Sequence, residues 1–145
     1  MTRRQLLKAI DSGKIKESIR NAERRTSGEI CVSVSPLFWG NVESAAKKAF
    51  DRLGMTRTRD RNAILIFIVP SRRKFVVLGD AGIHEKVGQQ FWHDVAAAVS
   101  EKFREGDFTG GIVKGIEVIG EQLATHFPYD VASDRNELSD DVDFE

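Results

Sequence analysis

A set of polar side chains near the middle of the sequence has the chemistry that binds hard divalent cations. Its members are Asp60, Asn62, Asp80, His84 and Glu85. Calcium and magnesium prefer oxygen ligands, so these residues would suit Ca²⁺ or Mg²⁺ if the fold brought them together. The alternative is structural. Asp80 would then cap the following helix, Asn62 would hold the start of a strand, and Glu85 would complement the helix dipole.

Phosphate ester hydrolysis is the reaction that such a metal site could support. A phosphatase needs either an activated nucleophile or a metal-activated water. Cys31 is not followed five residues later by an arginine, since Leu37 and Phe38 occupy that region, and no Asp-x-Asp pair begins a strand. Only a weak, metal-assisted reaction with His84 as the acid is left, so the sequence does not decide whether the chain is an enzyme.

Two clusters of basic residues offer a different chemistry. Arg57, Arg59 and Arg61 alternate within one loop, and a second cluster covers residues 72–74. Such clusters can hold phosphate groups. Proteins that bind single-stranded nucleic acid combine basic residues with aromatic ones, and no aromatic residues are interleaved with these clusters. We therefore expect at most a weak anion site at Arg57, Arg59 and Arg61, and no nucleic-acid binding.

A predicted β-hairpin would position the candidate metal ligands. Residues 63–69 are continuously apolar and β-rich, which is typical of a strand covered on both faces. The four residues 71–74 are too few for a crossover, so residues 75–78 should return as an antiparallel partner. This pairing would place Asp80 beside Asp60 and Asn62.

The remaining elements predict an α/β fold. Apolar residues at helical spacing indicate helices over residues 14–25, 42–53, 87–103 and 110–127, and alternation over residues 30–34 indicates a strand. Because a helix separates this strand from residues 63–69, the two strands should be parallel. We expect a three-layer αβα sandwich, Rossmann-like, with a small mixed sheet and helices on both faces.

Composition sets the outer limits of the interpretation. The 145 residues are 41% hydrophobic and 30% charged, which is ordinary for a globular domain. Cys31 is the only cysteine, so no internal disulfide can form. The longest apolar run is far shorter than the roughly 20 residues that span a membrane, and no signal peptide is evident. We expect no membrane insertion, a cytoplasmic location and a monomer.

The charge is distributed unevenly along the chain. Residues 128–145 carry seven acidic residues and Arg135, whereas residues 1–127 carry 21 basic and 15 acidic residues. We therefore expect one domain over residues 1–128 and an acidic, flexible C-terminal tail over 129–145. A solvated surface is one explanation of this asymmetry, and a tail that covers a basic body is another.

Several motifs together resemble the TPM-domain family over about residues 14–138. These are Ala-Glu-x-x-Thr-Ser-Gly-Glu-Ile at 22–30, Phe-x-x-Leu-Gly-Met at 50–55, Arg-Asn-Ala-Ile-Leu-Ile-Phe at 61–67, Gly-Asp-x-Gly-Ile-His-Glu-Lys-Val-Gly at 79–88 and Gly-Glu-x-Leu-Ala-x-His-Phe-Pro at 120–128. Asn136-Glu137-Leu138 resembles the usual end of the subfamily.

The resemblance implies several functions without selecting one. Members are similar to a thylakoid lumen protein described as an acid phosphatase, some relatives bind calcium, and many are exported or membrane-anchored. Our first hypothesis is an accessory or binding module with a divalent-cation site at one sheet edge and an unknown protein partner. The alternatives are a weak metal-dependent phosphatase and a polyanion-binding module regulated by its acidic tail.

Overall fold

The fold is built on a small mixed sheet. The computed structural model describes residues 3–36, 39–129 and 138–145. Its strands are β1 (Glu29–Val34), β2 (Ala63–Val69), β3 (Lys74–Gly79) and β4 (Asp143–Phe144), arranged in the order β3-β2-β1-β4. β1 is parallel to β2 and to β4, and β2 is antiparallel to β3. The predicted mixed sheet and its hairpin are confirmed.

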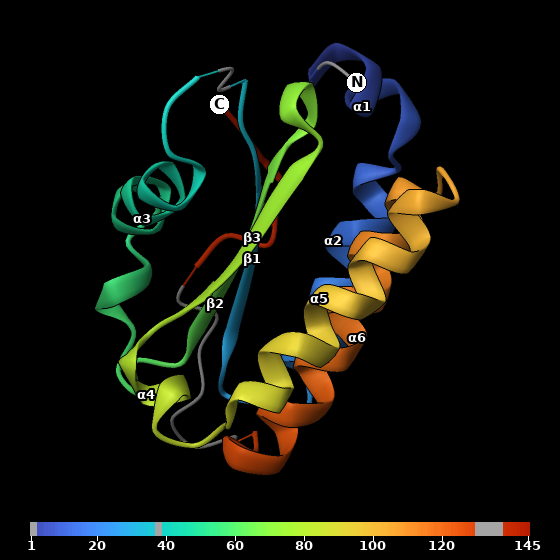
Figure 1. The fold of residues 1–145 in the computed structure, drawn as a ribbon. Helices are drawn as coiled ribbons and strands as arrows, with labels where there is room; N and C mark the ends of the chain where they lie inside the picture. The colour runs from blue at the N-terminus through green and yellow to red at the C-terminus, as the bar shows by residue number, and fades with distance from the viewer. Residues whose placement is uncertain (1–2, 37–38, 130–137) are drawn as a thin grey trace.

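Helices cover both faces of this sheet (Figure 1). α3 (Val42–Arg52) lies on one face, and α2 (Ser12–Glu23), α5 (Gln89–Arg104) and α6 (Phe108–His126) lie on the other. The shorter helices are α1 (Arg3–Ala9) and α4 (Ala81–His84), with single 3₁₀ turns at Met55–Arg57 and Pro70–Arg72. The predicted three-layer αβα sandwich is therefore the fold of the chain.

Side-chain caps mark the beginnings of α2, α3 and α6. The carboxylate of Asp11 accepts from the Lys14 N–H at 3.0 Å, and the Asn41 amide oxygen accepts from the Ser44 N–H at 2.8 Å. Asp107 does the same for α6 by accepting from the Gly110 N–H. Each cap satisfies a backbone donor that the first turn of a helix leaves unpaired.

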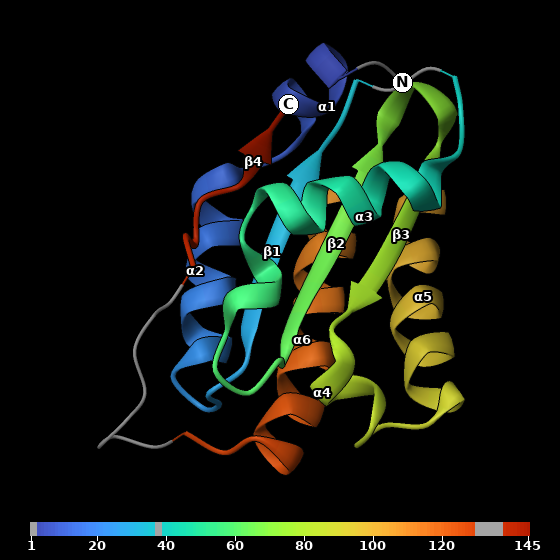
Figure 2. The same ribbon diagram turned by 90° about the vertical axis from the view of Figure 1, so that its left-hand side faces the viewer.

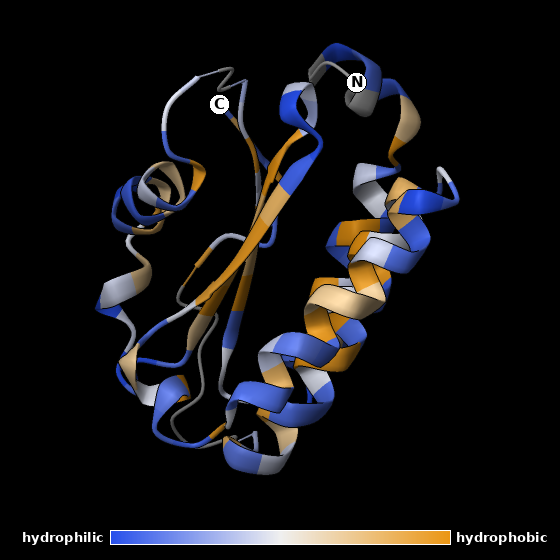
Figure 3. Cartoon of the chain, viewed as in Figure 1, coloured by the Kyte–Doolittle hydropathy of each residue, from blue (hydrophilic) through white to orange (hydrophobic). Residues whose placement is uncertain are grey.

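β2 is the centre of the core because both of its faces are covered. Ile64, Ile66 and Ile68 belong to the cluster that also contains the buried residues of α2, α5 and α6. Leu65 and Phe67 point the other way and pack with the buried residues of α3. Full burial of such side chains contributes roughly 1.5–3 kcal/mol each, so β2 holds the two halves of the core together. In Figure 3 the strands between the helix layers are coloured mainly as hydrophobic.

The end of the chain differs from the expected free tail. Residues 138–145 pack against the sheet, and β4 pairs with β1 through Ser33↔Asp143 and Val34↔Phe144. In Figure 2 this segment lies beside β1 at the sheet edge opposite β3. Apolar contacts and ion pairs with the rest of the domain offset the conformational entropy that this acidic segment loses when it is ordered. Residues 130–137 of the predicted tail, which include Asn136 and Glu137, lie outside the described residues.

Candidate functional site

The predicted approach of residues 60–62 to residue 80 is correct at the level of the backbone. Register pairs Ile64 with Gly79, and the Asp80 N–H donates to the Ala63 carbonyl at 3.0 Å. One turn later the Gly82 N–H donates to the Arg61 carbonyl at 2.8 Å. The start of β2 and the turn after β3 thus form one edge of the molecule, which we call the Asp80 edge (residues 58–62 and 79–85).

Asp80 is bound by an arginine at this edge. Its carboxylate accepts from Arg61 Nε at 2.6 Å and from Arg61 Nη2 at 2.7 Å, and it also accepts from the Ala81 N–H at 2.8 Å. Burial of Asp80 opposes its ionisation, but the Arg61 hydrogen bonds, the Ala81 N–H and the Arg61 charge outweigh burial and lower the pKa of Asp80. Asp80 is therefore ionised, and it also caps α4.

Arg61 has an unusual backbone conformation at the entry of β2. Arg61 has a φ of 51°, in the left-handed region that residues with a Cβ seldom adopt. The next residue, Asn62, enters β2 with its side chain 1% exposed and donates to Ser27 Oγ at 3.2 Å. The structural alternatives for Asp80 and Asn62, a helix cap and a strand entry, both describe contacts that these residues make.

Asp60, His84 and Glu85 each have different surroundings. Asp60 is exposed and pairs with Arg59, whose Nη2 lies 3.2 Å from Oδ2. His84 Nε2 lies 3.1 Å from the Gly79 carbonyl oxygen, and its ring stacks on Trp92 with centroids 5.0 Å apart. Glu85 is exposed at the end of α4.

The Asp80 edge therefore brings the predicted residues close together along the backbone, but their side chains do not form one cluster. In the part of the chain that the structure describes, no three His, Cys, Asp or Glu side chains are arranged to hold a metal ion. Two of the three arginines of the predicted anion site, Arg59 and Arg61, bind the carboxylates of Asp60 and Asp80. The main contact at this edge is an ion pair between the buried carboxylate of Asp80 and the exposed guanidinium of Arg61.

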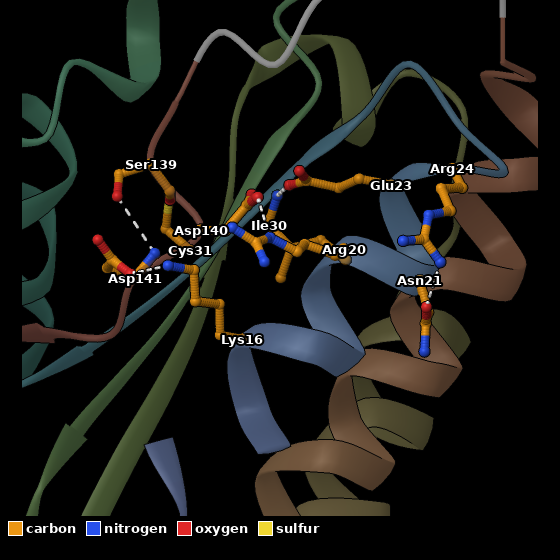
Figure 4. Close-up of polar contacts among 10 residues, drawn as sticks. All are labelled: Lys16, Arg20, Asn21, Glu23, Arg24, Ile30, Cys31, Ser139, Asp140 and Asp141. Atoms are coloured by element: carbon orange, nitrogen blue, oxygen red, sulfur yellow. Dashed lines mark hydrogen bonds and ion pairs between the residues drawn. The ribbon is translucent and has the colours of Figure 1, made fainter. Parts of the chain in front are cut away.

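Sequence reasoning missed a second group of polar residues, between α2 and the C-terminal segment (Figure 4). Glu23 accepts from the Ile30 N–H at 2.9 Å and hydrogen-bonds to Asp140, which is 8% exposed. Burial, the Asp140 hydrogen bond and the nearby Glu29 charge raise the pKa of Glu23 far above its ordinary value. A signal for this was present, because Glu23 lies four residues after the buried Ile19 on the apolar face of α2.

Cys31 lies under the same C-terminal segment. It is 6% exposed, and its Sγ lies 4.0 Å from the Ser139 carbonyl oxygen. Burial first, and then the charges of Glu23 and Glu29, raise the pKa of the Cys31 thiol to about 12. A thiol that stays protonated is a poor nucleophile, so this geometry agrees with the sequence-based exclusion of a cysteine phosphatase.

Ion pairs hold the C-terminal segment on the body. Lys16 Nζ lies 2.7 Å from Asp141 Oδ1, and Arg20 Nε lies 3.5 Å from Asp140 Oδ2. Arg52 of α3 contacts Asp143 at 2.6 Å, and the same Nη2 lies 2.9 Å from Glu145 Oε1. The acidic segment thus connects α2 and α3, on opposite faces of the sheet, to the β1 edge.

Comparison with known proteins identifies the family of this chain. The family profile of the TPM domain matches residues 1–122. The chain belongs to the TPM-domain family. The NMR structure of the BA42 protein from the psychrophilic bacterium Bizionia argentinensis is 33% identical, covers 94% of this chain and 95% of its own, and superposes with a TM-score of 0.87.

Two more distant structures share the fold of this TPM domain. The N-terminal domain of cg2496 from Corynebacterium glutamicum is 16% identical, with a TM-score of 0.60 and coverage of 77% of this chain and 70% of its own. The N-terminal domain of a P. gingivalis protein is 15% identical, with a TM-score of 0.68 and coverage of 84% and 83%. No match is found among curated proteins.

None of the helices within residues 3–36, 39–129 and 138–145 combines the length and the apolar character needed to cross a membrane.

Proposed function

We propose that this TPM domain is a binding module rather than a catalyst, and that it takes up a divalent cation at the Asp80 edge in exchange for the Arg61 guanidinium. One observation carries the proposal. The Asp80 side chain is only 6% exposed and ionised, yet its partner Arg61 is 49% exposed. The exposed guanidinium can move out to solvent when a cation takes its place, because the incoming positive charge keeps the buried Asp80 carboxylate compensated.

Oxygen atoms at this edge supply ligands of the kind that calcium prefers. Gly82 lies so close to the loop that a Cβ there would be 2.3 Å from the Asp60 carbonyl oxygen and 2.7 Å from that of Arg61. The Asp80 carboxylate is held in place by the Ala81 N–H. Carboxylates and backbone carbonyls are ligands of Ca²⁺, which accepts irregular geometry more readily than Mg²⁺. Asp60 adds a second carboxylate on the same loop.

Titration of calcium and magnesium, followed by NMR on the amides of residues 58–62 and 79–85, tests the proposal. Asp80→Asn should abolish binding, because it removes the charge that holds the cation. Arg61→Gln should tighten binding severalfold, because it removes the competing guanidinium. Arg57→Gln is the matched control, since it removes one arginine of the same loop without touching Asp80, and it should bind as the wild type does.

Two outcomes would contradict cation exchange. Equal calcium affinity in the wild type and in Asp80→Asn would show that the ion binds elsewhere, and weaker binding in Arg61→Gln would show that Arg61 does not compete. Metal-dependent turnover of a phosphate ester that is lost in Asp80→Asn would establish the phosphatase alternative instead.

The docked C-terminal segment favours a second candidate function, polyanion binding that the acidic segment covers. Asp140, Asp141 and Asp143 neutralise Arg20, Lys16 and Arg52. Removal of residues 138–145 would free these three cations, so binding to heparin at low salt should become tighter. Unchanged heparin binding by a folded truncated chain would exclude this candidate.

A further inference from the structure

The free edge of the sheet is a backbone template. β3 is the terminal strand at one edge of the sheet, because the strand order is β3-β2-β1-β4. The hydrogen bond from the Asp80 N–H to the Ala63 carbonyl fixes the alternation of this antiparallel ladder. Lys74, Val76 and Leu78 therefore direct their backbone groups toward β2, whereas Phe75 and Val77 direct theirs outward. No described residue is bonded to the outward groups of these two residues.

The edge is also unusually apolar for an exposed strand. β3 reads Lys-Phe-Val-Val-Leu-Gly, and its middle residues are all partly exposed. Edge strands are usually protected against pairing by charged residues, proline or bulges. Here the strand carries one charge at its first residue, so pairing with another extended chain is not prevented.

Hollows on both faces of the sheet flank the start of β3. The first is a groove of about 600 Å³ with Phe75, Phe103 and Phe108 on its walls. Phe103 contacts both of the other rings, at centroid distances of 5.6 and 5.3 Å. The second, of about 590 Å³, lies against the start of α3 and includes Val42 and Val76. Because side chains of a strand alternate between faces, a strand added beside β3 would direct successive side chains into one hollow and then the other.

Cations line the apolar groove beside this part of the edge. Arg73, Lys74 and Arg104 line the apolar groove, and all three are exposed. Within residues 3–36, 39–129 and 138–145, none of the three forms an ion pair. A partner segment that matched these charges would carry acidic residues. A second copy of the chain would present β3 itself, which contains no acid.

We propose that β3 binds an extended, acidic peptide segment of a partner protein by strand addition. The outward N–H and C=O groups of Phe75 and Val77 pair with the peptide backbone, a large apolar side chain enters the groove at Phe75, Phe103 and Phe108, and acidic side chains meet Arg73, Lys74 and Arg104. This surface lies at the opposite end of β3 from Asp80, so it does not depend on the cation exchange proposed above.

The probes are blocked seven-residue peptides in which Asp alternates with Phe, Val and Leu in different orders. NMR titration should shift the amides of Phe75 and Val77, and saturating peptide should slow their hydrogen exchange by about tenfold or more. The amides of Val76 and Leu78, already paired with β2, are internal controls and should change little. Peptides with Lys in place of Asp should bind much more weakly. Methylation of the peptide nitrogens that face β3 should abolish binding.

Charge reversal tests the protein side without disturbing the core. Arg73→Glu combined with Arg104→Glu should weaken peptide binding by about tenfold, since it replaces two rim attractions with repulsions. Lys47→Glu combined with Lys48→Glu makes the same change of charge on the exposed part of α3, and should have no effect.

Four results would overturn the proposal. They are absence of binding by all the acidic peptides up to millimolar concentration, equal binding of the N-methylated peptides, equal binding of the Lys peptides, and a dimer in sedimentation that already protects the Phe75 and Val77 amides without peptide. The last result would assign the edge to a second copy of the chain.

Discussion

Arg61 binds Asp80 with two hydrogen bonds, 2.6 and 2.7 Å long, although the residues are 19 positions apart in the sequence. The pair connects the entry of β2 to the first turn of α4, and it fixes the ionisation of the only carboxylate that is buried at this edge of the described structure. The stability and the binding chemistry of the edge therefore depend on the same contact.

The first prediction compares two acids of the edge by stability. Asp80→Ala should reduce the free energy of unfolding by about 2 kcal/mol, because it removes a helix cap and charge-assisted hydrogen bonds of a buried carboxylate. Asp60→Ala should cost less than about 0.5 kcal/mol, because Asp60 and Arg59 are both exposed. Urea denaturation measures both values, and equal losses would contradict the assigned roles.

The second prediction concerns acidic pH. The pKa values of Asp80 and Asp143 are lowered in the fold, so the unfolded chain binds more protons on acidification. The stability that these carboxylates contribute is present above the ordinary Asp pKa and is lost as the pH falls through their lowered values. The free energy of unfolding of Asp80→Asn should therefore fall less steeply below about pH 4 than that of the wild type. Parallel curves would show that Asp80 is not linked to folding.

The third prediction has the opposite sign. The raised pKa of Glu23 means that the fold holds a proton that the unfolded chain releases. Its contribution is fully present below the ordinary Glu pKa and is lost as the pH rises toward the raised value. Glu23→Gln keeps a hydrogen-bonding group of the same shape, so its melting temperature should exceed that of the wild type at pH 8 but not at pH 4. Glu17→Gln, at an exposed position of α2, should show no such difference.

The fourth prediction concerns the thiol under the C-terminal segment. The space around Cys31 is lined by Leu138, Ser139 and Val142. A chain that ends at residue 137 should react with a thiol reagent at least about tenfold faster. Cys31 would lose its cover, and its raised pKa would return toward the ordinary value as the burial that raises it is lost. Arg52→Ala, which breaks only the ion pairs with Asp143 and Glu145, should accelerate labelling less. Circular dichroism would show whether the truncated chain remains folded.

The fifth prediction concerns the backbone at the Asp80 edge. A Cβ at Gly82 would lie 2.3 Å from the Asp60 carbonyl oxygen, and backbone atoms cannot yield as a flexible side chain can. Gly82→Ala should therefore destabilise the fold by roughly 1–3 kcal/mol. At Gly13 in α2 a Cβ would meet only the Asp11 side-chain oxygen, at 3.4 Å, and Gly13→Ala should stabilise the protein by up to about 1 kcal/mol through helix propensity. Thermal denaturation of both variants separates the two effects.

Local patterns were sufficient for most of the fold. The apolar run of β2, the short connection to β3 and the helical stripe of α3 predicted a parallel unit followed by a hairpin, and the structure confirms both. The same patterns predicted that Asp80 would approach residues 60–62. These features are predictable because side-chain periodicity and connection length act over a few residues at a time.

The partners of the charged side chains were not predictable in the same way. Three arginines, Arg57, Arg59 and Arg61, lie in the loop before β2, and only the folded structure shows that Arg61 is the counterion of Asp80. The acidic composition after residue 128 indicates a solvated tail. Instead, Lys16 and Arg20 of α2 and Arg52 of α3 supply matching charges, and these are brought together only when the layers pack.

The sequence by itself determined the family, the layers and the hairpin, because these depend on the order of apolar and polar residues along the chain. Only the tertiary structure decided that Arg61 would be the counterion of Asp80, that Glu23 would be buried against Asp140, and that β4 would pair with β1 and leave β3 open. The physical reason is that charge pairing and strand-edge exposure depend on distances in space, which residues far apart in the sequence acquire only on folding.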